Sequence, residues 1–275
     1  MSVGVKIMAL ETKNNRGVDF SILLKEVVLC AEKAGEILLS YYQEGLARSY
    51  KADGSFATQA DIAAERYLIE ALTVLIPGAG FYAEESGIVV GNEYVWVIDP
   101  LDGTTNFAHG LPYFCTSIAL TYKGERILGV IYQPLLKELF TAQKGSGAFL
   151  NGKRLLVSEQ SKLEDSVITM CSSTDKNESV AQIGKMLSAY PLSLRNFGAS
   201  ALDLAYCAAG KMEACFYQGT SWWDIAAGSL MIEEAGGKVS TFQGDSINPE
   251  NRTFVGGNEP IFKEVSRLIK GIVSV

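Results

Sequence analysis

Apolar residues recur at helical spacing in the first part of the chain. Between residues 20 and 43 they form a stripe that begins at Leu23 and ends at Tyr41. Side chains three and four residues apart lie on one face of a helix, so this stripe predicts an amphipathic helix. A second helix is predicted over residues 61–76, because Pro77, followed by glycine, ends the helical pattern there.

The middle of the chain changes to short runs that are rich in β-branched and aromatic residues. Such runs, bounded by turn residues, are typical of strands. We expect strands at Gly80–Ala83, Tyr94–Asp99, Cys115–Tyr122, Ile127–Gln133 and Glu138–Ala142. Asn151 followed by Gly152 is a strong hairpin signal inside the run Gly147–Val157.

After Ser158 the pattern alternates between strand-like and helix-like segments. The expected strands are Val167–Met170, Leu192–Arg195 and Glu213–Tyr217, and the expected helices lie near 176–189, near 199–209 and at Asp224–Glu234. Alternation of this kind indicates an α/β arrangement.

These patterns predict a mixed α/β (α+β) protein with two halves. Residues 1–155 would form an N-terminal half of helices and an antiparallel sheet, and residues 156–275 would form a C-terminal α/β half. No Pro-rich or Ser-rich linker separates the halves, so we expect them to share a wide interface.

The charge of the chain narrows the choice of partners. Its 275 residues include 24 Lys and Arg against 31 Asp and Glu, so the net charge is −7. An acidic surface repels nucleic-acid backbone and anionic lipid, and we expect neither nucleic acid nor membrane as a partner. No apolar stretch reaches the roughly 20 residues that span a bilayer, and residues 1–19 lack the features of a secretory signal.

The histidine and cysteine content excludes several mechanisms. His109 is the single histidine, so a three-histidine zinc site cannot form and any Ser-His-Asp mechanism would have to use this residue. The cysteines have no CxxC spacing and an odd total, which indicates reduced thiols and a cytoplasmic location. They are Cys30, Cys115, Cys171, Cys207 and Cys215.

The most informative stretch is Trp96–Asn106. An apolar strand leads directly into Asp99, and Asp102 follows three residues later. These two carboxylates and the carbonyl of Leu101 form an all-oxygen set suited to a hard cation such as Mg²⁺. Gly103–Thr105 begins a predicted helix, whose free N–H groups could hold a phosphate. The alternative interpretation is an ordinary Asp-Pro turn followed by a helix cap.

Three further acidic residues stand at the ends of predicted elements. Glu84 follows a short strand, a position where glutamate is usually solvated, and it could complete the cation site if it faces Asp99. Asp224 follows two tryptophans at a helix start, so it is either an N-cap or a buried carboxylate that needs a partner. Asp61 opens the second helix after an expected hairpin tip at residues 54–55, and a cap is equally compatible with its position.

These motifs resemble, in order and spacing, those of the inositol monophosphatase family of Mg²⁺-dependent, lithium-sensitive phosphatases. The resemblance covers roughly residues 20–270. Its most specific segments are Trp96–Phe107 and Trp223–Gly237, which ends in Glu-Ala-Gly-Gly. The resemblance implies a five-layered αβαβα sandwich and a homodimer.

The resemblance also implies a set of metal ligands. Glu84, Asp99 and the Leu101 carbonyl would bind the first Mg²⁺. Asp99, Asp102 and Asp224 would bind the second, with Asp99 bridging the two ions. A third, weaker ion would lie near Glu84.

The catalytic and substrate-binding residues follow from the same resemblance. Asp61 and the Thr104 hydroxyl would orient and deprotonate the attacking water, and the Gly103 and Thr104 amides would hold the phosphate. The remaining candidates for contact with phosphate or substrate are Thr105, Ala199 and Tyr217.

The chain departs from the family pattern at two places. Tyr217 stands where animal members have a substrate-contacting glutamate, seven residues before the metal-binding aspartate at Asp224. The loop around Asp53 also differs from the usual Asp-x-Val-Thr. Fructose 1,6-bisphosphate, histidinol phosphate and 3′-phosphoadenosine 5′-phosphate therefore remain open as alternative substrates.

The favoured function is Mg²⁺-dependent hydrolysis of a small phosphate monoester, myo-inositol monophosphate first, by metal-activated water. Two ions could neutralise the dianionic phosphate, and helix N–H groups would add oriented positive charge. No Cys, His or Asp nucleophile stands in a familiar setting, so direct attack without a phosphoenzyme is expected. The hypothesis from another class is a non-catalytic metal- or phosphate-binding regulator with the same fold.

Overall fold

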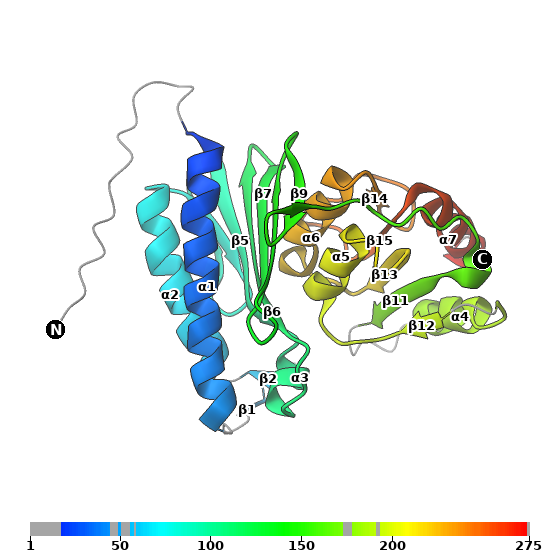
Figure 1. Ribbon diagram of the computed structural model, residues 1–275, viewed down its shortest axis with the longest axis horizontal. Coiled ribbons are helices and arrows are strands. Elements are labelled where there is room, and N and C mark those ends of the chain that lie inside the picture. Colours follow the sequence, from blue (N-terminus) through cyan, green and yellow to red (C-terminus); the bar gives the residue numbers. More distant parts are fainter. Residues whose placement is uncertain are drawn as a thin grey trace.

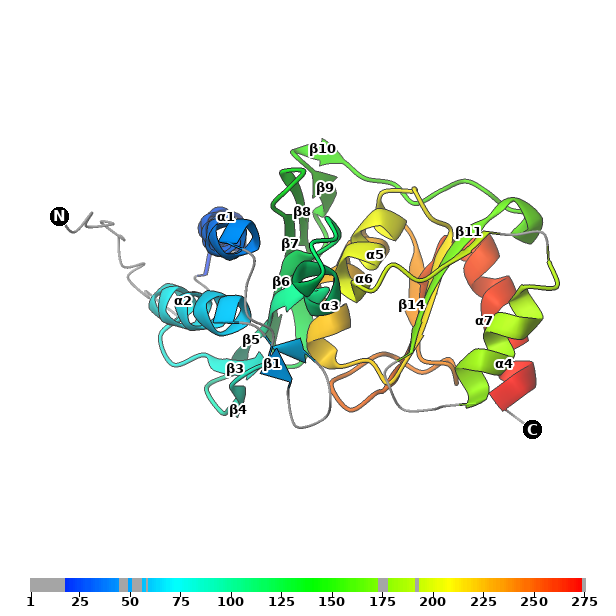
Figure 2. The same cartoon turned by 90° about the horizontal axis from the view of Figure 1, so that it is seen from below.

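The computed structural model describes residues 18–44, 49–50, 56–57, 59–172, 178–190 and 193–273. Five layers follow one another, which Figure 2 shows from one side. The helices of the layers are α1 (Phe20–Glu44) and α2 (Gln59–Leu75) outside the first sheet, α5 (Ser200–Ala208) and α6 (Trp222–Glu234) between the sheets, and α4 (Glu178–Leu187) and α7 (Glu259–Val273) outside the second sheet. The mixed α/β class and the αβαβα order expected from the sequence are confirmed.

The first sheet has eight strands in the order β10-β9-β8-β7-β6-β5-β3-β4. Their bounds are β3 Gly80–Ala83, β4 Gly87–Val89, β5 Tyr94–Asp102, β6 Cys115–Tyr122, β7 Glu125–Gln133, β8 Glu138–Gln143, β9 Gly147–Leu150 and β10 Lys153–Arg154. The expectation of an antiparallel sheet was wrong at one pair, since β3 and β5 are parallel. The reason is that β4 folds back on the outer edge of β3, and the chain then crosses to the inner edge of β3.

The second sheet has five strands in the order β12-β11-β13-β15-β14. Their bounds are β11 Val167–Ser172, β12 Ser193–Arg195, β13 Ala214–Gln218, β14 Lys238–Ser240 and β15 Thr253–Gly257. Strand β11 runs parallel to β12 and β13, whereas β15 pairs antiparallel with β13 and β14. Strands β14 and β15 and helix α7 were not predicted from the sequence.

Short elements complete the fold. They are β1 (Ser49–Tyr50) and β2 (Phe56–Ala57), which pair antiparallel, α3 (Thr104–Ala108) and a 3₁₀ turn at Leu163–Asp165. The hairpin tip expected at residues 54–55 and the loop around Asp53 lie outside the described residues. The hairpin at Asn151 and Gly152 is confirmed, because both residues have positive φ between β9 and β10.

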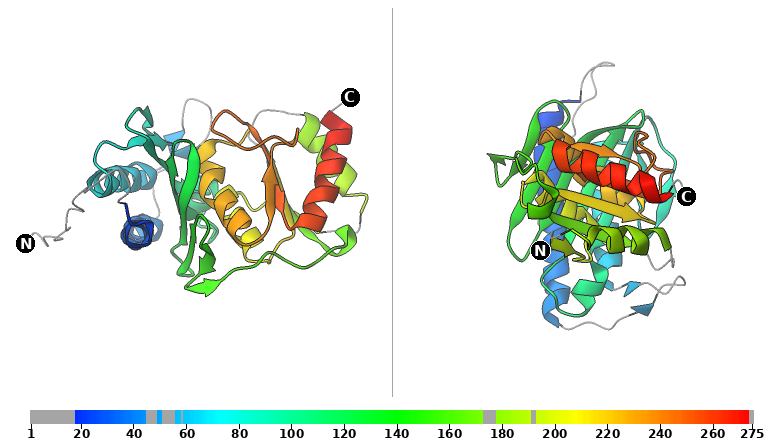
Figure 3. Two further views of the ribbon diagram at one scale, coloured as in Figure 1. Left: turned by 90° about the horizontal axis from the view of Figure 1, so that it is seen from above. Right: turned by 90° about the vertical axis from the view of Figure 1, so that its right-hand side faces the viewer.

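The apolar stripe of α1 packs where its spacing predicted. Leu23, Val27 and Leu38 are buried in a cluster between α1, α2 and the first sheet, and Figure 1 shows α1 along that face. Two further apolar clusters hold α5 and α6 between the sheets and α4 and α7 on the outer face, the last visible in Figure 3. None of the described helices is long and apolar enough to cross a membrane.

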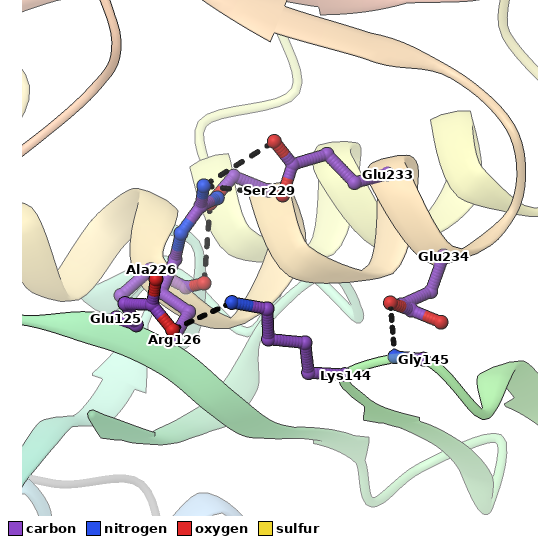
Figure 4. Close-up of polar contacts among 8 residues, drawn as sticks. All are labelled: Glu125, Arg126, Lys144, Gly145, Ala226, Ser229, Glu233 and Glu234. Carbon is purple, nitrogen blue, oxygen red and sulfur yellow. Dashed lines mark hydrogen bonds and ion pairs between the residues drawn. The ribbon is translucent and has the colours of Figure 1, made fainter. Parts of the chain in front are cut away.

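Polar contacts fix α6 onto the first sheet (Figure 4). From β7, the Arg126 guanidinium donates a hydrogen bond to Ser229 Oγ over 2.5 Å and lies 3.1 Å from the Glu233 carboxylate. The two carboxylate oxygens of Glu234 accept hydrogen bonds from the Gly145 and Gly147 amides, each at 2.7 Å. Because these side chains link the last turns of α6 to the first sheet, they help to set where the start of this helix lies.

Candidate active site

A bulge in β5 separates the two acids of the most informative motif. Asp99 pairs with Ser117 and Asp102 pairs with Cys115, so three steps along β5 oppose only two along β6. An extra residue of this kind breaks the ladder locally and redirects side chains, and bulges are frequent next to active sites. Pro100 lies inside the bulge, where it has no N–H to offer to the ladder.

Asp99 lies at the centre of an acidic cluster. It is 2% exposed, and its Oδ1 accepts a hydrogen bond from the Leu101 amide at 3.0 Å. Burial raises the pKa of Asp99 well above its usual range. Negative charges of neighbouring carboxylates raise this pKa further, and these neighbours are Glu84, Asp102 and Asp224. The charges of these three acids therefore act on Asp99, and a shared role of the four carboxylates as metal ligands stays a prediction.

Asp102 holds the beginning of α5. Its carboxylate accepts hydrogen bonds from three consecutive backbone amides, at 3.0 Å from Ser200, 2.8 Å from Ala201 and 3.3 Å from Leu202. Burial raises the pKa of Asp102 well above its usual range, as do the charges of Asp224 and Asp203, while the N–H groups of Leu202 and Ala201 oppose the rise. No local sequence pattern reports this link, because the partners are about 100 residues away along the chain.

Asp224 is placed one turn inside its helix. Helix α6 begins at Trp222 and is capped by Ser221, so the alternative of Asp224 as N-cap was wrong and it occupies the third helical position. Its Oδ2 accepts hydrogen bonds from the Ser221 amide at 2.6 Å and from the Thr220 hydroxyl at 3.0 Å. Burial raises the pKa of Asp224, and the positive charge of Arg252 is among the groups that lower it.

Thr104 connects the acidic motif to α2. Its hydroxyl lies 3.3 Å from Oδ1 of Asp61 and 3.0 Å from the Leu101 carbonyl oxygen. Asp61 is fully buried in the first turn of α2. Thr105 is exposed in α3, and its carbonyl accepts from the His109 amide. The separation of Asp61 and Thr104 is slightly longer than the roughly 2.6–3.2 Å typical of a general base and its proton donor, and the catalytic roles of these two residues stay predictions.

Gly103 allows close approach of two loops to the start of α3. Its φ is 91° and ψ is 34°, a left-handed conformation. A Cβ at this position would lie 2.8 Å from the Tyr113 carbonyl oxygen and 3.1 Å from the Ala199 Cβ. Ala199 is buried, so its small side chain and the glycine together bring the α5 start against the proposed phosphate-binding segment.

Replacement of Gly103 by Ala will therefore destabilise the protein by about 2–4 kcal/mol, since a left-handed residue with a side chain costs roughly 1–2 kcal/mol and a steric clash adds to it. Gly110→Ala is the matched control, because Gly110 also has positive φ, 72°, but has no atom within 4 Å of an added Cβ. Urea unfolding of the two variants measures the difference, and equal losses would contradict the importance of close packing at Gly103.

Asn106 ties two loops of the site together. Its side-chain amide donates hydrogen bonds to the Tyr113 carbonyl at 2.8 Å and to the Phe197 carbonyl at 2.7 Å. The first carbonyl follows α3, and the second lies just before α5. This residue was within the predicted motif, but only the packed fold shows that it holds the Phe197 carbonyl, two residues before Ala199.

Tyr217 is directed into the interior. It is 1% exposed, and its hydroxyl lies 3.4 Å from Asp203 Oδ2 and 3.3 Å from the Thr169 hydroxyl. Tyr113 donates to the other oxygen of Asp203 at 2.5 Å. The contact of Tyr217 with substrate stays a prediction, and Asp203 is a buried acid of this region that was not predicted.

The buried Asp203 makes the metal-free protein less stable as pH rises. Burial raises the pKa of Asp203 from 3.8 to about 7, although hydrogen bonds from Tyr113 and Tyr217 oppose the rise. The folded state thus holds this proton more tightly than the unfolded chain does. The stabilisation that this bound proton gives is fully present below the pKa of Asp203 in the unfolded chain. It is lost as pH rises towards the pKa of Asp203 in the folded protein, and it amounts to about 1.4 kcal/mol for each unit by which the two pKa values differ.

Chelator-treated protein will accordingly lose stability between about pH 5 and about pH 7, with the raised pKa values of the acidic cluster acting in the same direction. Urea unfolding at several pH values measures the slope. Asp203→Asn removes one titrating group and will give a shallower slope than the wild type. A wild-type stability that rises with pH over this range would contradict the shift.

The donor set fits a hard divalent cation. Buried carboxylates that raise one another's pKa are stable only when protonated or neutralised by a cation, and oxygen-only sets are those that Mg²⁺ prefers. Among the described residues, no three His, Cys, Asp or Glu side chains already form a cluster that could hold a metal ion. The individual ligand assignments therefore stay predictions.

Comparison with known proteins extends this picture to the whole chain. The family model of the inositol monophosphatase family matches residues 21–272. An inositol-1-monophosphatase of Mesorhizobium japonicum is 41% identical over 259 residues, covering 91% of this chain and 97% of its own. The Nus factor SuhB of Pseudomonas aeruginosa is 37% identical, covering 90% of this chain and 96% of its own.

Solved structures agree with these sequence matches. The extragenic suppressor protein SuhB of Bartonella henselae has a TM-score of 0.87 at 38% identity, covering 90% of this chain and 98% of its own. The IMPase of Thermotoga maritima has a TM-score of 0.84 at 32% identity, covering 92% and 98%. The five-layered αβαβα sandwich of this chain thus places it in the class of α/β proteins with this architecture. Within that class, the chain belongs to the inositol monophosphatase family.

Proposed function

We propose that this protein is a Mg²⁺-dependent phosphoric monoester hydrolase whose substrate is myo-inositol monophosphate. The observation that carries the proposal is that the charges of Glu84, Asp102 and Asp224 act on buried Asp99, whose motif continues into the glycine that opens α3. The name inositol-1-monophosphatase of relatives near 40% identity supports the same reaction.

The ligand assignment follows the acidic cluster. Glu84, Asp99 and the Leu101 carbonyl would hold one ion, and Asp99, Asp102 and Asp224 a second. When bound, Mg²⁺ neutralises charge on the phosphate and on the leaving oxygen and lowers the pKa of water.

The chain's own groups would then orient the reactants. The Gly103 and Thr104 amides would bind phosphate oxygens, since first-turn N–H groups lack partners within the helix. Oδ1 of Asp61, 3.3 Å from Thr104 Oγ, would accept the proton that leaves the attacking water through the threonine hydroxyl. Both groups are held by the fold before substrate arrives, which lowers the reorganisation required for reaction.

The test is phosphate release by the purified protein from a panel of small esters, with Mg²⁺ and with a chelator. The panel contains myo-inositol 1-phosphate, fructose 1,6-bisphosphate, histidinol phosphate and 3′-phosphoadenosine 5′-phosphate. Mg²⁺-dependent release with the highest kcat/KM for the inositol ester is the expected result. Absence of release from every ester would favour a non-catalytic metal- or phosphate-binding protein.

A different preferred ester is the second candidate, and the burial of Tyr217 favours it. The glutamate that the resemblance leads us to expect is replaced by a tyrosine whose hydroxyl is bonded inside the protein. An inositol ring would therefore lack that carboxylate contact. A kcat/KM for another ester of the panel that exceeds the inositol value would establish this alternative.

We further propose that the protein works in the cytoplasm as a homodimer. Its five cysteines are all unpaired, which fits a reducing compartment. The dimer is the assembly implied by the family resemblance. Light scattering coupled to gel filtration should give about twice the mass of one chain, and a mass of one chain would reject the dimer.

A further inference from the structure

Glu65 is a buried acid of α2 that the proposed chemistry does not use. It is 3% exposed. One of its carboxylate oxygens accepts a hydrogen bond from the Glu85 amide at 2.9 Å, and the other accepts from the Ser86 amide at 2.8 Å. Both oxygens of one carboxylate thus hold two consecutive amides of the turn between β3 and β4. Hydrogen bonds to an ionised acceptor are stronger than those between neutral groups.

The turn that Glu65 holds carries the candidate ligand Glu84. The amide of Glu84 itself donates to the Ile98 carbonyl at 3.2 Å, and Ile98 directly precedes Asp99 in β5. The turn is therefore fixed on one side by β5 and on the other by α2. With both attachments in place, the backbone of Glu84 has little freedom to move away from Asp99.

Helix α2 presents two acids on one buried face. Asp61 and Glu65 stand four residues apart, one helical turn, and both are buried. Asp61 contacts Thr104 near the start of α3, while Glu65 contacts the turn next to Glu84. One rigid helix thereby sets the positions of two separate parts of the site.

We infer that Glu65 is a positioning residue for Glu84, which increases the affinity of the site for the divalent cation without binding the cation. This inference rests on the proposed function. Groups that orient metal ligands through hydrogen bonds typically change metal affinity by about 10- to 100-fold when they are replaced. The effect should therefore fall on metal binding more than on the rate at saturating metal.

The variants are Glu65→Gln and Glu65→Ala, with Glu70→Gln as the matched control on the exposed face of the same helix. Gln keeps one acceptor oxygen but turns an N–H group towards the second amide. A surface pocket of about 570 Å³ lies against Glu65, Glu85 and Ser86, so water can reach the amides in the Ala variant. Calorimetric titration with Mg²⁺, without substrate, gives Kd, and thermal unfolding of chelated protein gives the intrinsic stability.

The expected result is a Kd for Mg²⁺ raised about 10-fold or more in Glu65→Gln and further in Glu65→Ala. The Glu70→Gln control should match the wild type, and kcat of Glu65→Gln at saturating Mg²⁺ should stay within about threefold of the wild type. A purely structural role would lower Tm and leave Kd unchanged in the folded fraction, and that outcome in Glu65→Gln would overturn the inference. The proposed function would survive that outcome, whereas a wild type that neither binds Mg²⁺ nor releases phosphate would remove both.

Discussion

Replacement of Asp99 by Asn will lower kcat by about 10³-fold or more, because the variant loses the carboxylate assigned to both ions, and each factor of ten corresponds to about 1.4 kcal/mol of transition-state stabilisation. Asn keeps an acceptor oxygen for the Leu101 amide, which Asp99 Oδ1 binds at 3.0 Å. The local backbone should therefore stay in place. Initial rates of phosphate release at saturating Mg²⁺ measure the effect.

The same substitution will raise the melting temperature of the chelated protein. In the wild type, burial and three neighbouring acids all raise the pKa of Asp99, so the ionised cluster destabilises the fold when no cation is present. A neutral amide removes one charge from that cluster. The control is Asp165→Asn, at an exposed acid far along the chain. It should change neither kcat nor the melting temperature of the chelated protein. Near-normal activity of Asp99→Asn would show that the metal assignment is wrong.

Replacement of Asp61 by Asn will lower kcat by about 10²- to 10⁴-fold, the range typical of a lost general base. The amide oxygen can still accept a hydrogen bond from the Thr104 hydroxyl, but it cannot take up a proton at neutral pH. Because Asp61 is not assigned as a metal ligand, the Kd for Mg²⁺ should change little. Kinetics and calorimetric titration on the same preparation therefore separate loss of the base from loss of metal.

Two substitutions at Thr104 provide the companion test. In the wild type, the Thr104 hydroxyl lies 3.3 Å from Asp61. Thr104→Ser keeps a hydroxyl at this position and should retain most activity, whereas Thr104→Ala should approach the loss expected for Asp61→Asn. The double variant Asp61→Asn/Thr104→Ala should then lose little more than either single variant, since both act on the same proton. If the losses of the two single variants added fully in the double variant, the two residues would act on separate steps.

Sequence alone predicted the elements whose local pattern is strong. The stripe of α1 and the strand leading to Asp99 follow regular periods, and the hairpin at Asn151 depends on two adjacent residues. Helix α7 also has a usable signal, since Ile261, Val265 and Ile269 recur every fourth residue and are buried. In contrast, β14 has only three residues, and β15 ends in two glycines, so neither has a pattern that outweighs turn propensity.

The residues of the candidate site likewise divide into those that local sequence predicts and those that only the fold places. Asp99 and Asp102 stand in one compact motif, so their proximity follows from short-range geometry. The amides that hold Asp102 and the acid that holds the Glu84 turn come from distant segments, and only the packed fold brings them together. Tyr217 illustrates the limit most clearly, because its sequence position suggested a substrate contact while its burial reflects the strands around it.

The attachment of α6 to the first sheet has a consequence for recombining relatives of this protein. A genetic crossover near residue 155 would take Arg126 and the Gly145–Gly147 loop from one parent, and Glu233 and Glu234 from the other. A chimera in which only one side of these contacts is retained would leave Arg126, whose side chain is 15% exposed, without Glu233, whose side chain is 40% exposed. A mostly buried charge that loses its partner destabilises the fold, although solvent around the exposed partner reduces the loss. Stable hybrids should therefore come from parents that both have Arg126 and the Gly145–Gly147 loop in the first part of the chain and Glu233 and Glu234 in the second.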